Sequence, residues 1–148
     1  MAVRDLKDCP YYLISRSTLA VTAELKQEFA LAGLEGIRPA YLGVLMSLWR
    51  DDGLSAVELA RRAGLEPSTM TGLLDRMERD QLLMRSADPD DRRAQRIHLT
   101  ETGRTVREPT LSAVDRTLAR VLEGVAEKDL VRIKDTLRRV LANTDRAT

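Results

Sequence analysis

Residues 54 to 81 read LSAVELARRAGLEPSTMTGLLDRMERDQ, a stretch with two helix starts and one helix stop between them. Ser55 and Glu58 have the spacing of a capping box, in which each side chain binds the backbone N–H of the other residue and a helix begins. Gly64 suits the left-handed position that ends a helix, and Pro67 suits the first turn of the next. Two short helices joined by a glycine-containing turn form a helix-turn-helix, which this stretch predicts.

The second predicted helix, from Pro67 to about Gln81, has two faces. Its apolar residues recur at helical spacing and are expected to face the core; they are Met70, Leu73, Leu74 and Met77. The other face begins with hydroxyls and a glycine, small groups that can approach base edges and phosphates closely. The candidate contacts on this face are Ser68, Thr69, Thr71, Gly72 and Arg76. Serine and threonine are also common helix caps, so a purely structural role stays open.

A β-hairpin is predicted directly after this helix. The segment LLMRS (82–86) is typical of a short strand, ADPDD (87–91) of a turn, and RAQRIHLT (93–100) of a strand with one apolar face. A helix-turn-helix followed by such a hairpin is a winged helix, in which the second helix lies in the major groove of DNA and the hairpin tip reaches an adjacent groove.

The hairpin tip combines charge with rigidity. Pro89 stiffens the turn, and the guanidinium groups that follow suit a narrow, strongly negative minor groove. The arginines concerned are Arg92, Arg93 and Arg96. Asp91 would oppose DNA if it faced outward, so we expect it to pair with an arginine and fix the direction of that side chain. A charged hairpin can also be merely solvated, but its position after a helix-turn-helix favours the DNA-binding interpretation.

Long helices are predicted on both sides of this region. Apolar residues at steps of three, four and seven predict a helix from Tyr11 to about Ala32, and Pro39 opens a second one. Beyond the hairpin, Thr100 is placed to cap a long helix that runs to about Glu123.

A last helix is predicted from about Glu127 to Asn143, and its apolar residues continue a heptad-like seam that needs a partner. The expected fold class is therefore mainly α with a small β-wing, a winged helix-turn-helix lobe plus long N- and C-terminal dimerisation helices.

Composition limits the function classes. The 148 residues include 24 Lys and Arg against 23 Asp and Glu, so the net charge is only +1 and any site for a polyanion must be local. One cysteine excludes an intramolecular disulfide framework, and no apolar run is long enough for a membrane helix. With one histidine and one cysteine, we expect no metal site and no cofactor. We expect a cytoplasmic protein without a membrane partner.

The segment DPDDRRAQRIHLTETG (88–103) resembles the wing signature of the MarR family of bacterial transcription regulators, which ends in Leu-Thr-x-x-Gly as Leu99, Thr100 and Gly103 do here. STMTGLLDRMERDQLL resembles the recognition helix of that family, and LSAVELARRAGL the helix before it. The resemblance covers about residues 11 to 143. Gln81 departs from it, because the family often has glycine there.

The resemblance implies one MarR-type domain over residues 1–148, with dimerisation helices at 11–38 and 104–143 and a DNA-binding lobe at 39–103. It implies a homodimer that binds double-stranded DNA at a pseudo-palindromic operator, expected to act as a repressor, and a small-molecule or redox signal that alters the spacing of the two lobes. By position, Arg93 is the minor-groove arginine and Asp91 the residue that orients it. The matching groove-facing residues are Ser68, Thr69, Thr71 and Arg76.

Two groups of residues are candidates for receiving a signal. Cys9 precedes Pro10 and could lie at a helix N-terminus, where the helix dipole favours a thiolate; the alternative is an inert thiol. Aromatic residues and one arginine could line the cleft in which the family binds small, often aromatic, anions. They are Tyr11, Tyr12, Arg16, Tyr41 and Trp49. Aromatic residues on a helix stripe, Trp49 above all, more often belong to the core.

Two other function classes compete with a DNA-binding regulator. An enzyme is disfavoured, because the chain has a single histidine, no glycine-rich phosphate loop and no nucleophile beside a base. A winged-helix protein-interaction module is the stronger rival, and the small net charge favours it.

Overall fold

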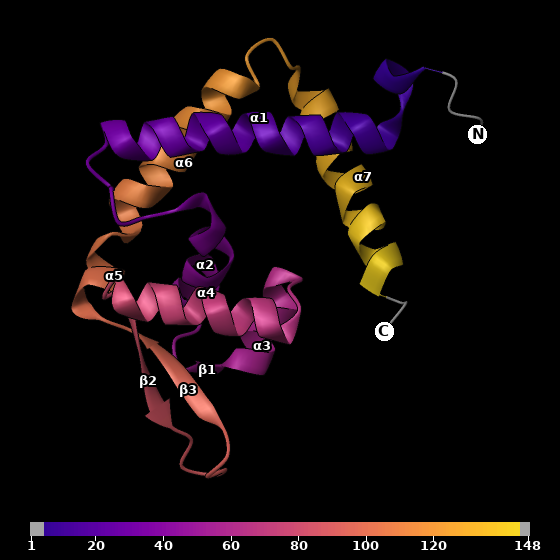
Figure 1. Ribbon diagram of the computed structural model, residues 1–148. Helices are drawn as coiled ribbons and strands as arrows, with labels where there is room; N and C mark the ends of the chain where they lie inside the picture. Colours follow the sequence, from indigo (N-terminus) through magenta and orange to yellow (C-terminus); the bar gives the residue numbers. More distant parts are fainter. Residues whose placement is uncertain (1–4, 146–148) are drawn as a thin grey trace. The chain divides into compact units, whose positions relative to one another are not determined.

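The computed structural model describes residues 5–145 and divides into two compact units, one up to Thr117 and one from Leu118 onward (Figure 1). The first unit contains the helices and strands η1 (Leu6–Asp8), α1 (Pro10–Leu31), η2 (Pro39–Tyr41), α2 (Leu42–Arg50), β1 (Leu54–Ser55), α3 (Ala56–Ala63), α4 (Pro67–Arg79), β2 (Leu83–Ala87), β3 (Gln95–Leu99) and α5 (Glu101–Thr105). Helix α6 (Arg107–Val121) continues from the first unit into the second, which contains α7 (Glu127–Asp145).

The predicted helix-turn-helix is confirmed. The Ser55 amide donates to Glu58 Oε2 at 2.8 Å, and the Glu58 amide donates to Ser55 Oγ at 3.2 Å, so the capping box is complete. The Glu58 carboxylate accepts from the Ser55 amide and also from Ser55 Oγ, and these two bonds lower the pKa of Glu58. Gly64 ends α3 with φ of +65°, and Pro67 is the first residue of α4.

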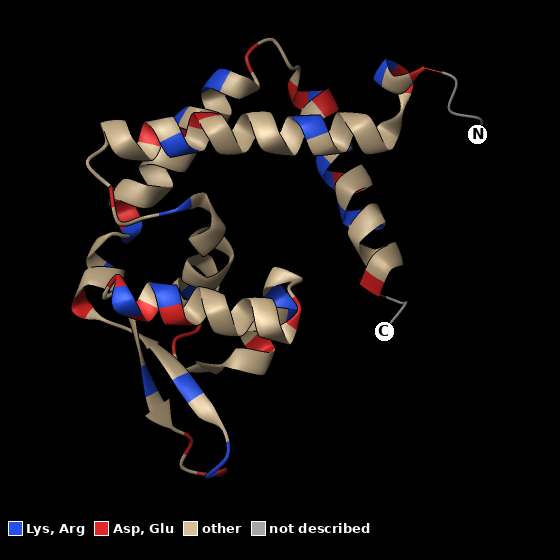
Figure 2. Ribbon diagram, viewed as in Figure 1, with Lys and Arg blue, Asp and Glu red and all other residues tan. Residues whose placement is uncertain are grey.

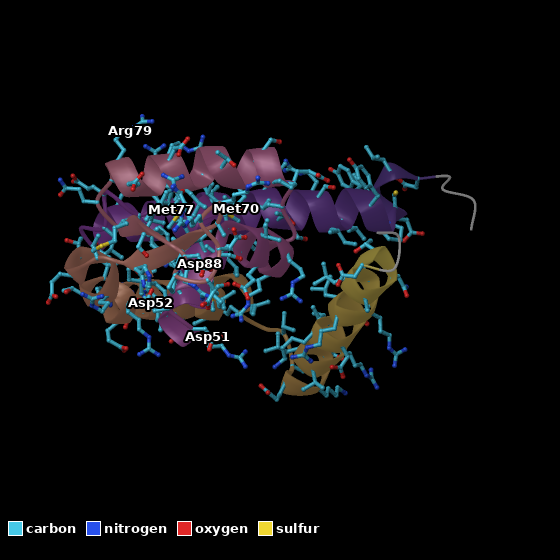
Figure 3. The ribbon with its side chains drawn as sticks, turned by 90° about the horizontal axis from the view of Figure 1, so that it is seen from below. Asp51, Asp52, Met70, Met77, Arg79 and Asp88 are labelled. Carbon is cyan, nitrogen blue, oxygen red and sulfur yellow. The ribbon has the colours of Figure 1, made fainter. Side chains whose placement is uncertain are left out.

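The core of the winged lobe lies between α4 and the helices and strands around it. The predicted inner face of α4 is buried, and Figure 3 shows Met70 and Met77 on the inner side of this helix. The large side chains that are less than 2% exposed include Phe29, Tyr41, Leu45, Leu48, Leu59, Met70, Leu74, Met77 and Ile97. Residues from α1, α2, α3, α4 and β3 therefore share one core.

The hairpin belongs to an antiparallel sheet of three strands in the order β1-β3-β2. Strands β2 and β3 pair from Leu83↔Leu99 to Ala87↔Gln95, as a wing requires. The third strand, β1, was not predicted, because it consists of only two residues, the second of which caps α3. Gln95, in the strand predicted to have one apolar face, is exposed because it lies next to the turn of the hairpin.

The end of the wing is fixed to the end of α4. The Thr100 amide donates to the Leu82 carbonyl at 3.1 Å, and Thr100 Oγ donates to the Gln81 carbonyl at 2.6 Å. The same hydroxyl accepts from the Gly103 amide and caps α5. A Cβ on Gly103 would lie 2.1 Å from the Leu82 carbonyl oxygen, so only glycine fits. The Leu-Thr-x-x-Gly motif is thus the joint between wing and helix.

The long helix predicted from Thr100 to Glu123 is wrong in one respect, because it is broken at Val106 into α5 and α6. Pro109 explains the break. It has no N–H to donate to the Thr105 carbonyl, and its ring crowds that carbonyl. The last helix begins at Glu127 as predicted and ends at Asp145.

The second unit leaves much of its apolar surface exposed in the isolated chain. Helix α7 has no buried residue, and its large apolar side chains Val131, Ile133, Leu137, Val140 and Leu141 are 42–63% exposed. Within residues 5–145, no helix is both long and apolar enough to cross a membrane.

Gln81 is the one non-glycine residue with positive φ in the described part of the chain, at +59°. We expect Gln81→Gly to raise the free energy of unfolding by about 0.5–1 kcal/mol. The left-handed conformation costs a side chain about 1–2 kcal/mol, and the extra freedom that glycine loses on folding offsets about 0.5–1 kcal/mol of this gain. Chemical denaturation measures the change, and Gln81→Ala, which keeps a Cβ, should bring no gain. A less stable glycine variant would contradict this account.

Candidate nucleic-acid interface

The outer face of α4 has the properties expected of a helix that approaches another surface. Ser68, Thr69 and Thr71 are exposed, and a Cβ built on Gly72 meets nothing within 4 Å. Thr71 Oγ donates to the Pro67 carbonyl at 3.0 Å, which leaves the oxygen free to accept. No side chain caps the N-terminus of α4, and Pro67 has no N–H, so the amides of the first turn are available to a phosphate.

The charges of α4 are confined to its C-terminal half (Figure 2). Arg76 and Arg79 are exposed, and neither forms an ion pair with any residue between 5 and 145; Figure 3 shows Arg79 pointing away from the lobe. The two carboxylates of this half, on Asp75 and Glu78, are both bound by Arg85 of β2. The charge that α4 offers to a partner is therefore cationic.

The wing tip is ordered by two local turns. The Asp88 carboxylate accepts from the Asp90 amide, and the Asp91 carboxylate accepts from the Arg93 amide, each at 2.9 Å. Asp91 therefore has a different partner from the expected guanidinium, because a backbone amide two residues along lies within easier reach. Asp91 fixes the backbone from which the Arg93 side chain leaves.

The three arginines of the wing that were predicted to contact DNA have different surroundings. Arg92 and Arg93 are exposed and form no ion pair within the described part of the chain. Arg96 is half-buried, with Nε 3.1 Å from Asp88 Oδ2 and Nη1 donating to the Gly53 carbonyl at 2.9 Å. These contacts brace the hairpin against the loop before β1, and the predicted contact of Arg96 with DNA stays a prediction. The Gly53 carbonyl comes from a distant segment, which the local pattern could not show.

Arg85 is a residue that the sequence analysis missed. It follows the buried Leu83 at an alternate position of β2, so its side chain points toward α4 and is only 20% exposed. A charged residue at an inward-facing strand position needs a partner. The inward-facing strand position of Arg85 was therefore the sequence signal that could have identified it.

The expected signal residues do not form one cleft. Cys9 is half-buried at the N-cap of α1, as its position before Pro10 predicted. Tyr11 is 79% exposed, Tyr12 is half-buried and Arg16 is exposed on α1. Tyr41 is fully buried, and its hydroxyl donates to the Asp80 carboxylate at 2.5 Å. Burial raises the pKa of this hydroxyl, and the bond to Asp80 raises it further.

Trp49 also serves the core, since its indole N–H donates to the Gly103 carbonyl at 2.8 Å. Its ring borders a cleft of about 420 Å³ with Arg50, Arg104 and Arg107. The larger cleft, of about 480 Å³, lies elsewhere, between the C-terminal half of α1 and the segment that leads into α2. It is lined by Thr22, Lys26, Phe29, Ala30, Leu34, Glu35, Ile37, Arg38, Pro39 and Ala40. None of the five residues that were expected to bind a ligand lines this cleft. Their spacing in the sequence did not show which faces of α1 and α2 meet.

Comparison with known proteins accounts for this architecture. The family model described as "MarR family" matches residues 37–94, from just before η2 to the wing tip. This match supports a winged-helix regulator of the MarR family. It is 33% identical over 97 residues to the HTH-type transcriptional repressor MdtR of Bacillus subtilis (strain 168), a match that covers 66% of this chain and 63% of that protein.

A second MarR-type relative is the HTH-type transcriptional regulator TtmR of Methylorubrum extorquens (strain PA1). It is 42% identical over 74 residues, which cover 50% of this chain and 37% of that protein. The matches thus span less than two thirds of either relative. Among solved structures, the PcaV regulator of Streptomyces coelicolor, in complex with its natural ligand, has a TM-score of 0.82 and 27% identity over 96% of this chain and 98% of that one.

A substitution at Gly72 distinguishes a structural role of the exposed α4 face from a role in DNA binding. Gly72→Ala should stabilise the protein by about 0.8–1 kcal/mol, because alanine is the better helix former and its Cβ has room. If the face meets DNA closely, the same change should weaken binding to a preferred duplex by about tenfold, a loss within the range of one base contact. Thermal unfolding and fluorescence anisotropy measure the two effects, with Gly36→Ala, outside α4, as the control. Unchanged affinity would mean that DNA does not approach Gly72.

Proposed function

We propose that this chain is a homodimeric, sequence-specific DNA-binding transcription regulator, expected to act as a repressor. The observation that carries the proposal is the arrangement of charge on the winged lobe. Four arginines on α4 and the wing tip are exposed and without ion pairs among residues 5–145, namely Arg76, Arg79, Arg92 and Arg93. The neutral N-terminal half of α4 provides the hydroxyls and the glycine that can read base edges.

The small net charge does not oppose this function, because several acids of the lobe are used internally. Arg85 neutralises Asp75 and Glu78, and Arg96 neutralises Asp88. Asp91 is occupied by a backbone amide. The names of the relatives MdtR, a repressor, and TtmR, a regulator, support the same proposal. We propose that α4 enters the major groove and that Arg93 enters the minor groove.

We propose that segments 11–38 and 104–143 form the dimer, and that 39–103 is the DNA-binding lobe. The support is the apolar surface that the isolated chain leaves exposed at both ends. On α1 it includes Leu13, Ile14 and Leu19, and from α6 to α7 it includes Leu118, Val125, Ile133, Leu137 and Val140. Large apolar side chains that recur along an exposed helix favour an interface.

We further propose that a small amphipathic anion, such as an aromatic carboxylate, modulates DNA binding from the 480 Å³ cleft. Its lining is mainly apolar. The charged residues of the lining are two cations, Lys26 and Arg38, and one carboxylate, Glu35. The cleft wall runs directly into Tyr41, whose hydroxyl binds Asp80 at the C-terminal end of α4. A ligand that moves this wall can therefore alter the position of α4. The ligand-bound PcaV structure supports such an effector.

Selection from a pool of random duplexes tests DNA binding. We expect enrichment of an inverted repeat whose half-sites lie about one helical turn apart, with affinity that falls steeply with salt. If no sequence is enriched and the protein is not retained on duplex DNA at low salt, the proposed function fails, and the winged-helix protein-interaction module is the better account.

Leu137→Asp tests the dimer, because a carboxylate on this seam would be buried unpaired at a cost of several kcal/mol. We expect sedimentation to show a dimer for the wild type at micromolar concentration and mainly monomer for the variant. Val57→Asp, which changes an apolar side chain that is 78% exposed on α3, should remain a dimer. A monomeric wild type would contradict the proposal, and the inverted repeat would then have no structural basis.

A further inference from the structure

Arg85 of β2 binds two carboxylates of α4 at once. Its Nη2 lies 2.7 Å from Asp75 Oδ1, and its Nη1 lies 2.5 Å from Glu78 Oε2. The arginine side chain is 20% exposed, whereas those of Asp75 and Glu78 are 54% and 44% exposed. The guanidinium thus lies behind the carboxylates, and the carboxylates lie at the surface.

Asp75 lies on the part of α4 that is proposed to enter the groove. Ser68, Gly72, Asp75 and Arg79 follow one another at steps of four, three and four residues, so they form one stripe along the helix. A free carboxylate in the middle of this stripe would repel the phosphates on both sides of a groove. Glu78 lies one helical step away, beside Arg79, and would add to the repulsion.

We propose that Arg85 is a positioning residue for DNA recognition. It neutralises the negative charge that α4 would otherwise present to the phosphates, and it does not touch DNA itself. This inference rests on the proposed function. By neutralising Asp75 and Glu78, Arg85 leaves Arg76 and Arg79 as the net charge of the helix. By bridging β2 and α4, it also makes the wing and the helix approach DNA as one body.

The chemistry of the bridge requires arginine. Its planar guanidinium presents two N–H edges in a fixed fork, so one side chain can bind two carboxylates from different turns of a helix. The ammonium group of lysine is a single point of charge and cannot hold both carboxylates in this geometry. The partial burial of the guanidinium also protects both contacts from screening by salt.

The test compares three proteins on the duplex that the wild type prefers. Arg85→Met exposes two unpaired carboxylates and should weaken binding by on the order of tenfold to a hundredfold. The triple variant Arg85→Met/Asp75→Asn/Glu78→Gln removes the guanidinium together with both carboxylates. It should bind within about threefold of the wild type and keep the same dependence of log K on log salt, because no phosphate contact has been lost.

Two results would overturn the inference. One is a triple variant that binds as weakly as Arg85→Met, and the other is a triple variant whose salt slope is smaller by about one, the sign of a lost phosphate contact. If Arg85→Met does not fold, as circular dichroism would show, the triple variant compared with the wild type still decides the question. Failure of the wild type to bind any duplex would instead reject the proposed function.

Discussion

The close contact between Gly103 and the Leu82 carbonyl is the constraint on which the winged lobe depends. A single Cβ at position 103 would lie 2.1 Å from that oxygen. Around the contact, Thr100 binds the carbonyls of Gln81 and Leu82, and Trp49 binds the carbonyl of Gly103. Because Leu82 follows α4 and Thr100 follows β3, this joint sets the direction in which the wing leaves α4. Arg85 makes a second connection between the same two parts, from β2 to α4.

The attraction of the winged lobe to DNA depends on where its charges lie and not on their sum. A net charge of +1 gives no long-range attraction to a polyanion. The lobe instead pairs Asp75, Glu78 and Asp88 with Arg85 and Arg96, and leaves other arginines exposed at the proposed interface. Arginines thus have two opposite roles in this lobe, and only their partners distinguish the two roles. The same arrangement lets a protein of low net charge present a cationic helix and a cationic wing tip.

Local signals in the sequence predicted most of the fold. The capping box of Ser55, the left-handed Gly64 and the inner face of α4 act over a few residues, so their spacing is sufficient to find them. Pro109 is a local signal for the helix break, but the heptad-like apolar spacing of the same segment led us to predict one continuous helix. The two-residue strand β1 and the contact of Arg96 with Gly53 depend on segments far apart in the chain, whereas the bridge formed by Arg85 and the 480 Å³ cleft join neighbouring elements whose facing sides the spacing did not show. Their partners become visible only in the folded structure.

Methylation protection on the selected duplex tests the central claim, that α4 lies in the major groove and the wing tip in the minor groove. Dimethyl sulfate modifies guanine at N7 in the major groove and adenine at N3 in the minor groove, so one experiment reports both contacts. The account predicts that the wild type protects guanine N7 within each half-site and adenine N3 beside it, and that Arg93→Ala loses only the adenine protection. No protection by the wild type, or adenine protection that survives in Arg93→Ala, would contradict it.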